Sequence, residues 1–333
     1  MRIWRRLNQR FLLRYRLEYA AALSFVYGAR ALSPRVAWAL ARWIGRTVFL
    51  LGLRRKAMLT NLEVAFPDLS EEERRRMALR TSEHIACMMM DIILQTRMVR
   101  RRDVLERIRL TGWARDYMDE HGREGLRRRA RRVLFLTAHL GNWELASGFF
   151  SLLGVQISPV YRAMRNPYVD RLFRKIRLDS QYEVIERRGA VQSMLDRFEQ
   201  GGNIGFLFDQ EALHGIYVPF FGVPACTHKT PAVLARDYDV KIFLGVVVRE
   251  GDFLHYEARG ELLDMSAFKT DDRQQDLERI TADLMRRLEA EIRRYPEQYF
   301  WVHRRWKRVG VHGEEHVPEK KRETHRPQTP SNG

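Results

Sequence analysis

A histidine and a glutamate five positions apart, His139 and Glu144, carry the residue types best suited to catalysis. They open and close the segment HLGNWE at positions 139–144. A neutral imidazole accepts a proton, and a nearby carboxylate orients the ring and stabilises its charged form. The pair therefore predicts a general base with its partner. On one continuous helix, five residues turn through about 500° and separate the side chains, so a turn must intervene, which Gly141 permits.

The flanking sequence indicates the elements that position this pair. Residues 133–138 form an apolar run that predicts a buried strand, and Asn142 is suited to cap the helix that follows. His139 is thus expected at a strand end, and Glu144 in the first turn of a helix. Because the segment contains no serine to act as nucleophile, the attacking hydroxyl group is expected to come from the substrate. A histidine five residues before a glutamate also occurs by chance in many chains, so the rest of the sequence must decide.

Short apolar runs alternate with helical stretches between about residues 104 and 260. This alternation predicts an α/β layered fold, with a mostly parallel central sheet flanked by helices. The expected strands are 105–110, 132–138, 155–161, 182–186, 203–208, 240–248 and 253–259. The expected helices are 113–129, 142–152, 167–178, 189–200, 229–238 and 271–295.

Three regions follow from the patterning along the chain. Residues 1–100 are expected to form a mostly helical, membrane-associating region, residues 101–308 the α/β domain, and residues 309–333 a disordered polar tail. The first region is rich in arginine, and neither of its apolar stretches, 19–27 and 38–53, has the roughly twenty uninterrupted apolar residues of a confident membrane span. A basic amphipathic surface lying in the membrane interface is favoured. A spanning segment near 17–29 and an ordinary helix packed on the domain are the alternatives, and no secretory signal is expected.

The charge balance points to anionic partners. With 59 Lys and Arg against 42 Asp and Glu, the formal net charge is +17. Nucleic acid, anionic lipid head groups and an acidic carrier protein all fit such a chain. Cys87 and Cys226 do not form a disulfide framework and are interpreted as incidental buried thiols, and no structural zinc site is expected.

Six blocks of sequence resemble, in the same order, the lipid A biosynthesis acyltransferases of the late-acting lauroyl/myristoyl type. That family belongs to the superfamily of glycerolipid acyltransferases with a His-x4-Asp/Glu motif. The blocks are 61–67 (NLEVAFP), 138–144 (AHLGNWE), 161–167 (YRAMRNP), 186–190 (ERRGA), 209–210 (DQ) with 218–222 (VPFFG), and 296–307 (PEQYFWVHRRWK). Together they cover about residues 50–308. One departure is the pair Thr230 and Pro231, at a place where many relatives have a glycine before a helix.

The resemblance implies a catalytic pair, His139 and Glu144, with a set of substrate-binding residues around it. Those candidates are Arg162, Arg165, Asn166, Arg187, Arg188, Asp209 and Gln210. Arg162 follows a predicted strand, where a guanidinium can grip a phosphate or polarise a carbonyl group. Asp209 could orient His139 or an arginine, or bind a sugar hydroxyl. Asn166 also suits the start of a helix.

The resemblance also implies the reaction: a fatty acyl chain moves from acyl carrier protein or coenzyme A to a hydroxyl of a phosphorylated glycolipid, most simply a lipid A precursor. The expected location is the cytoplasmic face of a bacterial inner membrane. This chemistry requires no metal and no cofactor beyond the acyl thioester co-substrate. The alternatives are another lipid acceptor, such as a glycerol phosphate or a glycosylated phospholipid, and a non-catalytic basic protein that binds membrane or nucleic acid. No nucleic-acid partner is expected, because the sequence contains no recognised nucleic-acid module.

Two further segments have open interpretations. The apolar stretch 218–222 could line an acyl channel or pack in the core. The aromatic and basic stretch 301–307 has the composition of a surface that meets lipid head groups.

Overall fold

The protein is described by a computed structural model that covers residues 2–99, 107–161, 163–178, 184–186, 190–251 and 255–311. Among these residues, seven strands form one sheet in the order β1-β9-β8-β2-β5-β3-β4. The strands are β1 (Ile108–Gly112), β2 (Val133–Thr137), β3 (Ile157–Tyr161), β4 (Ile185–Glu186), β5 (Asn203–Leu207), β8 (Lys241–Arg249) and β9 (Tyr256–Leu263). Only the β8–β9 pair is antiparallel in this described sheet. The predicted α/β fold with a mostly parallel central sheet is confirmed.

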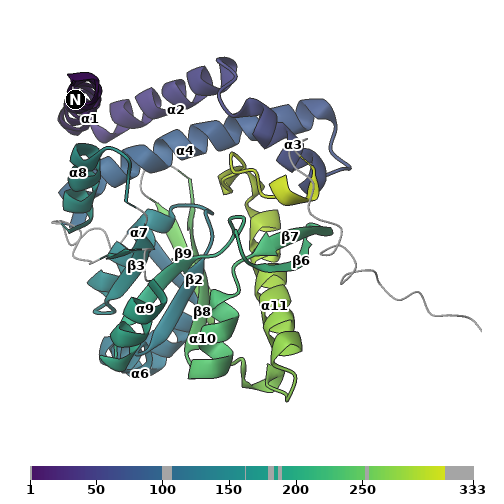
Figure 1. Cartoon of the computed structure of the whole chain (residues 1–333). Helices are drawn as coiled ribbons and strands as arrows, with labels where there is room; N and C mark the ends of the chain where they lie inside the picture. Colours follow the sequence, from purple (N-terminus) through teal and green to yellow (C-terminus); the bar gives the residue numbers. More distant parts are fainter. Residues whose placement is uncertain are drawn as a thin grey trace, which may run out of the picture.

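Helices connect the strands and cover both faces of the sheet (Figure 1). They are α6 (Trp113–Arg129), α7 (Trp143–Leu152), α8 (Pro167–Leu178), α9 (Ala190–Glu199), α10 (Thr230–Tyr238) and α11 (Arg273–Arg294), with short 3-10 turns at Ser266–Phe268, Pro296–Gln298 and Lys307–Val309. Each α-helix begins and ends within two residues of its predicted bounds. The alternating pattern located these elements because each one buries a single apolar face.

A β-hairpin that was not predicted lies beside the main sheet. It pairs β6 (Ile216–Phe220) with β7 (Val223–Thr227) in antiparallel register. Both turn residues, Phe221 and Gly222, have positive φ angles of 51° and 76°. Two successive positive φ angles are the mark of the tight turn that suits hairpins. Phe220 and Phe221 are buried in the main core, so core packing is the outcome for the apolar segment 218–222.

The N-terminal region is helical, as predicted. It consists of α1 (Arg2–Ala31), α2 (Pro34–Leu50), α3 (Arg55–Ala65) and α4 (Glu71–Val99). In Figure 1, α2 lies along the side of α4 that faces away from the sheet, and α1, seen end-on, lies above α8. The predicted boundary near residue 100 and nearly all of the predicted polar tail lie outside the described residues. In the described part of the chain, no single helix is both long and apolar enough to span a membrane. The helices α2 and α3 meet that length and apolarity only when taken together, and they are bent by 88° relative to each other.

The two faces of the sheet bury different sets of side chains, because residues alternate along a strand. Odd-numbered residues of β2, such as Phe135, pack with Phe149 and Phe150 of α7. Even-numbered residues, such as Leu136, pack in the larger core formed with α11. The carboxyl ends of β2 and β5 meet at one edge between these layers, and polar side chains gather there.

Candidate active site

His139 and Asp209 meet at the edge of the sheet where β2 and β5 end. These strands are parallel neighbours, with Thr137 paired to Leu207, so the residues that follow each of them lie close together. His139 Nδ1 lies 2.8 Å from Asp209 Oδ1, and the His139 backbone N–H donates to Asp209 Oδ2 at 3.0 Å. Because a carboxylate only accepts hydrogen bonds, Nδ1 carries the proton and Nε2 remains the basic atom.

The carboxylate that bonds to Nδ1 is therefore Asp209, whereas the sequence predicts that Glu144 orients the ring; the role of Glu144 stays a prediction. Burial alone would raise the pKa of Asp209, but the adjacent His139, through its charge and two hydrogen bonds, more than offsets burial and lowers the pKa. The Tyr299 hydroxyl also bonds to Asp209; burial, followed by the Asp209 charge, raises the pKa of Tyr299 well above its usual value. Asp209 thus stays ionised and Tyr299 protonated at neutral pH. The sequence could not identify Asp209 as the partner of His139. Their pairing depends on β5 lying beside β2, which is a feature of the tertiary structure.

Gln210 occupies the position at which a substrate hydroxyl would meet the base. Its amide nitrogen lies 3.2 Å from His139 Nε2, which accepts the hydrogen bond. The imidazole is held from the sides by the rings of Trp143 and Phe300, at centroid separations of 4.8 and 5.7 Å. A hydroxyl group that replaces the Gln210 amide would donate its proton along the same direction. Gln210 therefore lies in direct contact with His139 Nε2, and its predicted role in binding substrate stays a prediction.

The turn predicted at Gly141 is present and allows only glycine. Its φ is +64°, and a Cβ atom there would lie 2.0 Å from the Val247 carbonyl oxygen. The turn is fixed on both sides, since Gly141 N–H donates to the Gln298 carbonyl (3.0 Å) and Asn142 N–H to the Val247 carbonyl (2.7 Å). The loop that carries His139 is thus held between β8 and the C-terminal segment.

Asn142 caps α7, as predicted, and also connects the site to a buried polar cluster. Its side-chain oxygen accepts from Leu145 N–H at 3.3 Å, and its amide donates to the Tyr256 hydroxyl at 3.1 Å. Tyr256 in turn donates to Asp91, which also pairs with Arg249 at 2.8 Å. No sequence signal indicates this cluster, because its members come from α4, β8 and β9 and carry no common motif.

His84 of α4 supports the same turn, and its burial has a consequence for stability at low pH. Its Nε2 lies 3.1 Å from the Gly141 carbonyl oxygen, to which it donates. Burial first, and then the charge of Arg249, lower the pKa of His84 to about 3. The unfolded chain keeps the usual value of 6.5, so it binds the extra proton between those two pH values. The stability that neutral His84 contributes is therefore complete above pH 6.5 and is lost as the pH falls toward 3.

We expect His84→Gln to reduce the acid sensitivity of the fold. Glutamine can still donate to the Gly141 carbonyl but does not titrate. Between pH 7 and pH 5, the wild-type free energy of unfolding should fall by about 2 kcal/mol more than that of the variant. Urea unfolding at both pH values measures this difference. An equal fall for both proteins would show that His84 does not titrate as described.

A cavity of about 870 Å³ adjoins the site. His139, Glu144 and Gln210 line it together with mostly apolar side chains from β2, β3, β5, β8, α7 and α9. His228 and Thr230, from the segment that departs from the family pattern, also line it. Glu144 therefore shares the cavity with His139, although His139 Nδ1 donates its hydrogen bond to Asp209. Such a space fits a long apolar ligand with one reactive polar end.

The other predicted substrate-binding residues have different outcomes. Arg162, Arg187 and Arg188 lie outside the described residues. Arg165 is exposed in the turn before α8, and its role stays a prediction. Asn166 is a structural residue here, which corrects its assignment: it is 7% exposed, and its oxygen caps α8 by accepting from Tyr168 N–H at 3.0 Å.

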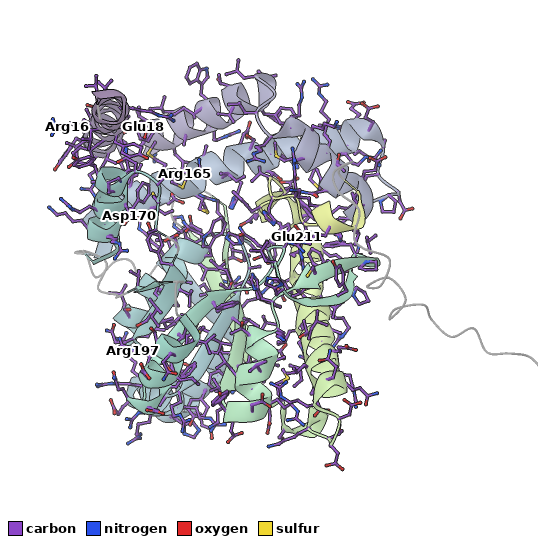
Figure 2. The ribbon with its side chains drawn as sticks, viewed as in Figure 1. Arg16, Glu18, Arg165, Asp170, Arg197 and Glu211 are labelled. Carbon is purple, nitrogen blue, oxygen red and sulfur yellow. The ribbon has the colours of Figure 1, made fainter. Side chains whose placement is uncertain are left out.

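The amide of Asn166 ties α8 to α1. It donates to the Tyr15 carbonyl at 2.9 Å and to Glu18 Oε2 at 3.0 Å. Figure 2 shows Glu18 on α1 above the start of α8, near Arg165. The Asn166 side chain therefore links α8 to α1 through hydrogen bonds.

The C-terminal aromatic and basic segment is core, so its interpretation as a lipid-facing surface is wrong. Trp301 and Trp306 are each 1% exposed, and Arg305 is 2% exposed. Arg305 donates to the Cys226 carbonyl at 2.7 Å and lies over the ring of Phe220, which stacks on Trp306. A guanidinium that is stacked on a ring and hydrogen-bonded can be buried. The amino-acid composition of such a buried segment is the same as that of a surface that meets lipid. Cys226 and Cys87 are buried free thiols, as predicted.

An α/β domain with a carboxylate-oriented histidine beside an apolar cavity has the parts of an enzyme that acts on a substrate with a long apolar portion. Residues 7–308 match the family of bacterial lipid A biosynthesis acyltransferases, and the chain belongs to this family. It is 28% identical over 257 residues to the lipid A biosynthesis lauroyltransferase of Escherichia coli (strain K12), covering 76% of this chain and 79% of that protein. It is 25% identical over 261 residues to the lipid A biosynthesis palmitoleoyltransferase of the same strain, covering 74% and 76%. A lipid A biosynthesis acyltransferase of Haemophilus influenzae (strain ATCC 51907 / DSM 11121 / KW20 / Rd) is 26% identical over 266 residues, covering 77% and 79%.

Proposed function

We propose that this protein transfers a fatty acyl chain from an acyl thioester to a hydroxyl group of a lipid A precursor, with His139 as the general base. The observation that carries the proposal is the position of His139. Its Nδ1 is bound to Asp209 at 2.8 Å, which leaves Nε2 basic, and the ring lines a largely apolar cavity of about 870 Å³. Family membership supports the reaction class and the acceptor.

The site supports a direct transfer with the following proton balance. His139 Nε2 takes the proton of the acceptor hydroxyl while the oxygen attacks the thioester carbonyl carbon. The tetrahedral intermediate collapses with cleavage of the carbon–sulfur bond, and the imidazolium returns the proton to the departing thiolate. The products are an ester and a free thiol. Asp209 stabilises the imidazolium at the intermediate stage, because its negative charge lies on the Nδ1 side of the ring.

The partners are assigned by charge and chemistry. A formal net charge of +17 suits an acidic acyl carrier protein and a phosphorylated acceptor, and coenzyme A thioesters offer the same reactive group. We assign Glu144 a place among the reacting groups because it lines the same cavity as His139. Gln210 would bind the acceptor hydroxyl, and Arg162, Arg165, Arg187 and Arg188 would bind its phosphates. This reaction requires neither a metal nor another cofactor.

Incubation of the full chain with donor and acceptor tests the function. Acyl carrier protein or coenzyme A thioesters would be combined with a lipid A precursor, and products identified by mass spectrometry. We expect a product heavier than the acceptor by one acyl group. Acylation of glycerol phosphate alone would favour the other acceptor class. Binding to vesicles or nucleic acid without any acyl transfer would favour a non-catalytic protein.

The proposed location is the cytoplasmic face of the inner membrane, with α1 and α2 as the contact surface. Most of the large apolar side chains that are exposed among the described residues belong to α1, α2 and the turn after α2. Trp43, Leu50 and Leu51 have exposed fractions of 63%, 66% and 72%. Exposed Arg35 and Arg54 flank them and would pair with lipid phosphates. Of these helices, α2 lies on the side of α4 opposite the sheet, and α1 lies above α8 (Figure 1).

Charged substitutions on this surface should weaken membrane binding without altering the catalytic site. We expect Trp43→Glu combined with Leu51→Glu to lower binding to vesicles of phosphatidylethanolamine and phosphatidylglycerol at least tenfold, because each side chain contributes about 1.5–3 kcal/mol when it leaves water. Co-sedimentation measures the bound fraction. Tyr238→Glu, at a 44% exposed residue of α10, is the matched control and should bind normally. Equal binding by the double variant would exclude this surface.

A further inference from the structure

One arm of the cavity runs beneath α7, along the odd-numbered face of the sheet. Thr137 and Phe135 of β2 form its inner wall at successive depths below His139, and Ser147 and Phe150 of α7 cover it. β2 ascends toward His139 while α7 descends from the Gly141 turn, so residues later in α7 lie deeper in the arm. We call this space the α7 arm.

Three phenylalanines close the deep end of the α7 arm. Phe135 pairs directly with Phe243 across β2 and β8, and Phe150 reaches them from α7. Their ring centroids are 5.1 Å apart for Phe135 and Phe243, 5.2 Å for Phe135 and Phe150, and 5.7 Å for Phe150 and Phe243. All three are at most 8% exposed. Mutually packed rings form a rigid floor, since no one of them can turn without displacing another.

Below this floor, Asn203 seals the sheet. Its side-chain oxygen accepts from Val133 N–H at 3.1 Å, and its amide donates to the Ala130 carbonyl at 2.8 Å. At the level of the floor itself, Ile157 fills the space beside Gly205. Gly205 pairs with both Phe135 and Pro159, and a Cβ there would approach Ile157 Cγ2 to 3.2 Å. The arm is thus open near His139 and blocked at one defined depth.

We propose that the α7 arm holds the donor acyl chain and that Phe135, Phe150 and Phe243 set its maximum length. This inference rests on the proposed acyl transfer. The carbonyl carbon must lie near His139 Nε2. Phe135 lies in β2 four residues before His139, which follows the end of that strand, and four extended residues span at most about 13 Å. Because each carbon–carbon bond of about 1.5 Å advances an extended chain by slightly less than its own length, the arm accommodates about ten carbons. The enzyme is a medium-chain acyltransferase by this geometry.

A longer chain meets the aromatic floor with its terminal methyl group. Accepting it would require either a bent chain or displaced rings, and overpacking of a buried cluster costs about 1–3 kcal/mol. Such a cost corresponds to a preference of about five- to hundredfold for chains that fit. Acyl chains that are too short leave part of the arm empty. Their binding free energy is weaker by about 0.8 kcal/mol for each missing methylene.

Two substitutions that act in opposite directions test the floor. Phe150→Ala removes one ring and should move the preferred donor to chains about two to four carbons longer. Ser147→Leu adds bulk higher in the arm and should move it to shorter chains. The matched control is Phe49→Ala, which removes the same ring from α2, where Phe49 packs in the other core at 2% exposure and does not line the cavity. We expect the control to keep the wild-type preference.

The full chain and each variant would be assayed with saturated acyl carrier protein and coenzyme A thioesters of 8 to 18 carbons. The relative kcat/KM across the series is independent of how much protein is folded. Opposite shifts in Phe150→Ala and Ser147→Leu, with none in Phe49→Ala, support the floor. Unchanged profiles in both variants overturn it, and Phe150→Leu provides the second deep variant if Phe150→Ala does not fold. If wild type transfers no acyl chain of any length, the proposed function itself fails.

Discussion

Replacement of His139 by alanine is expected to lower the rate of acyl transfer by about 10²- to 10⁴-fold, because the acceptor hydroxyl loses its general base. The effect should appear mainly in kcat, since an unreacted hydroxyl binds with little help from a neutral imidazole. Initial rates of product formation, measured by mass spectrometry with a lipid A precursor as acceptor, determine the change. The side chain is 14% exposed and lines the cavity, so its removal leaves no sealed void and the fold should persist.

His214→Ala is the matched control for this variant. His214 lies exposed in the loop after Asp209, so the same substitution removes an imidazole from the neighbourhood without touching the site. Its rate should equal that of wild type. A His139→Ala protein that transfers acyl chains at the wild-type rate would remove His139 from the mechanism.

Replacement of Asp209 by asparagine is expected to lower kcat by about 10²- to 10⁴-fold with little change in KM. An asparagine amide can donate to Nδ1, which would place the imidazole proton on Nε2 and abolish the base. Even with its oxygen toward the ring, asparagine lacks the charge that stabilises the imidazolium. Burial alone would raise the pKa of Asp209, but contacts with His139 lower it, so the wild-type carboxylate is charged at neutral pH.

Asp276→Asn separates this effect from a general loss of stability. Asp276 is completely buried at the start of α11, where it bonds to Arg236 and Thr270, far along the chain from the site. The substitution should lower the melting temperature and leave the rate per folded molecule unchanged. If Asp209→Asn retained wild-type kcat, the hydrogen bond at Nδ1 would be structural only.

The elements of the fold could be predicted from the sequence, because local apolar spacing distinguishes helices from strands. The β6–β7 hairpin escaped prediction because its strands are short and contain Pro219 and Pro224, which disfavour a strand assignment. The burial of Trp301 and Arg305 was not predicted from the sequence for another reason. A mixture of aromatic and basic residues is typical of a surface that meets lipid. Only the tertiary structure shows that Trp301 and Arg305 are enclosed by the core.

The candidate site could be predicted in part. His139 and the turn at Gly141 were located correctly, because both depend on a contiguous segment. The sequence places Asp209 among the site residues with several possible roles, since its pairing with His139 depends on the adjacency of β2 and β5. The cluster of Asp91, Arg249 and Tyr256 was not predicted, because its members meet only after α4 packs against the sheet.

The variant that carries both His139→Ala and Asp209→Asn tests whether the carboxylate acts through the imidazole. Residues that work as one unit give strongly non-additive losses. The rate of acyl transfer by the double variant should therefore equal that of His139→Ala alone, with the same acceptor and donor. A rate lower by the product of the two separate losses would show that Asp209 acts independently of His139, and would contradict a mechanism in which the carboxylate orients and charges the base.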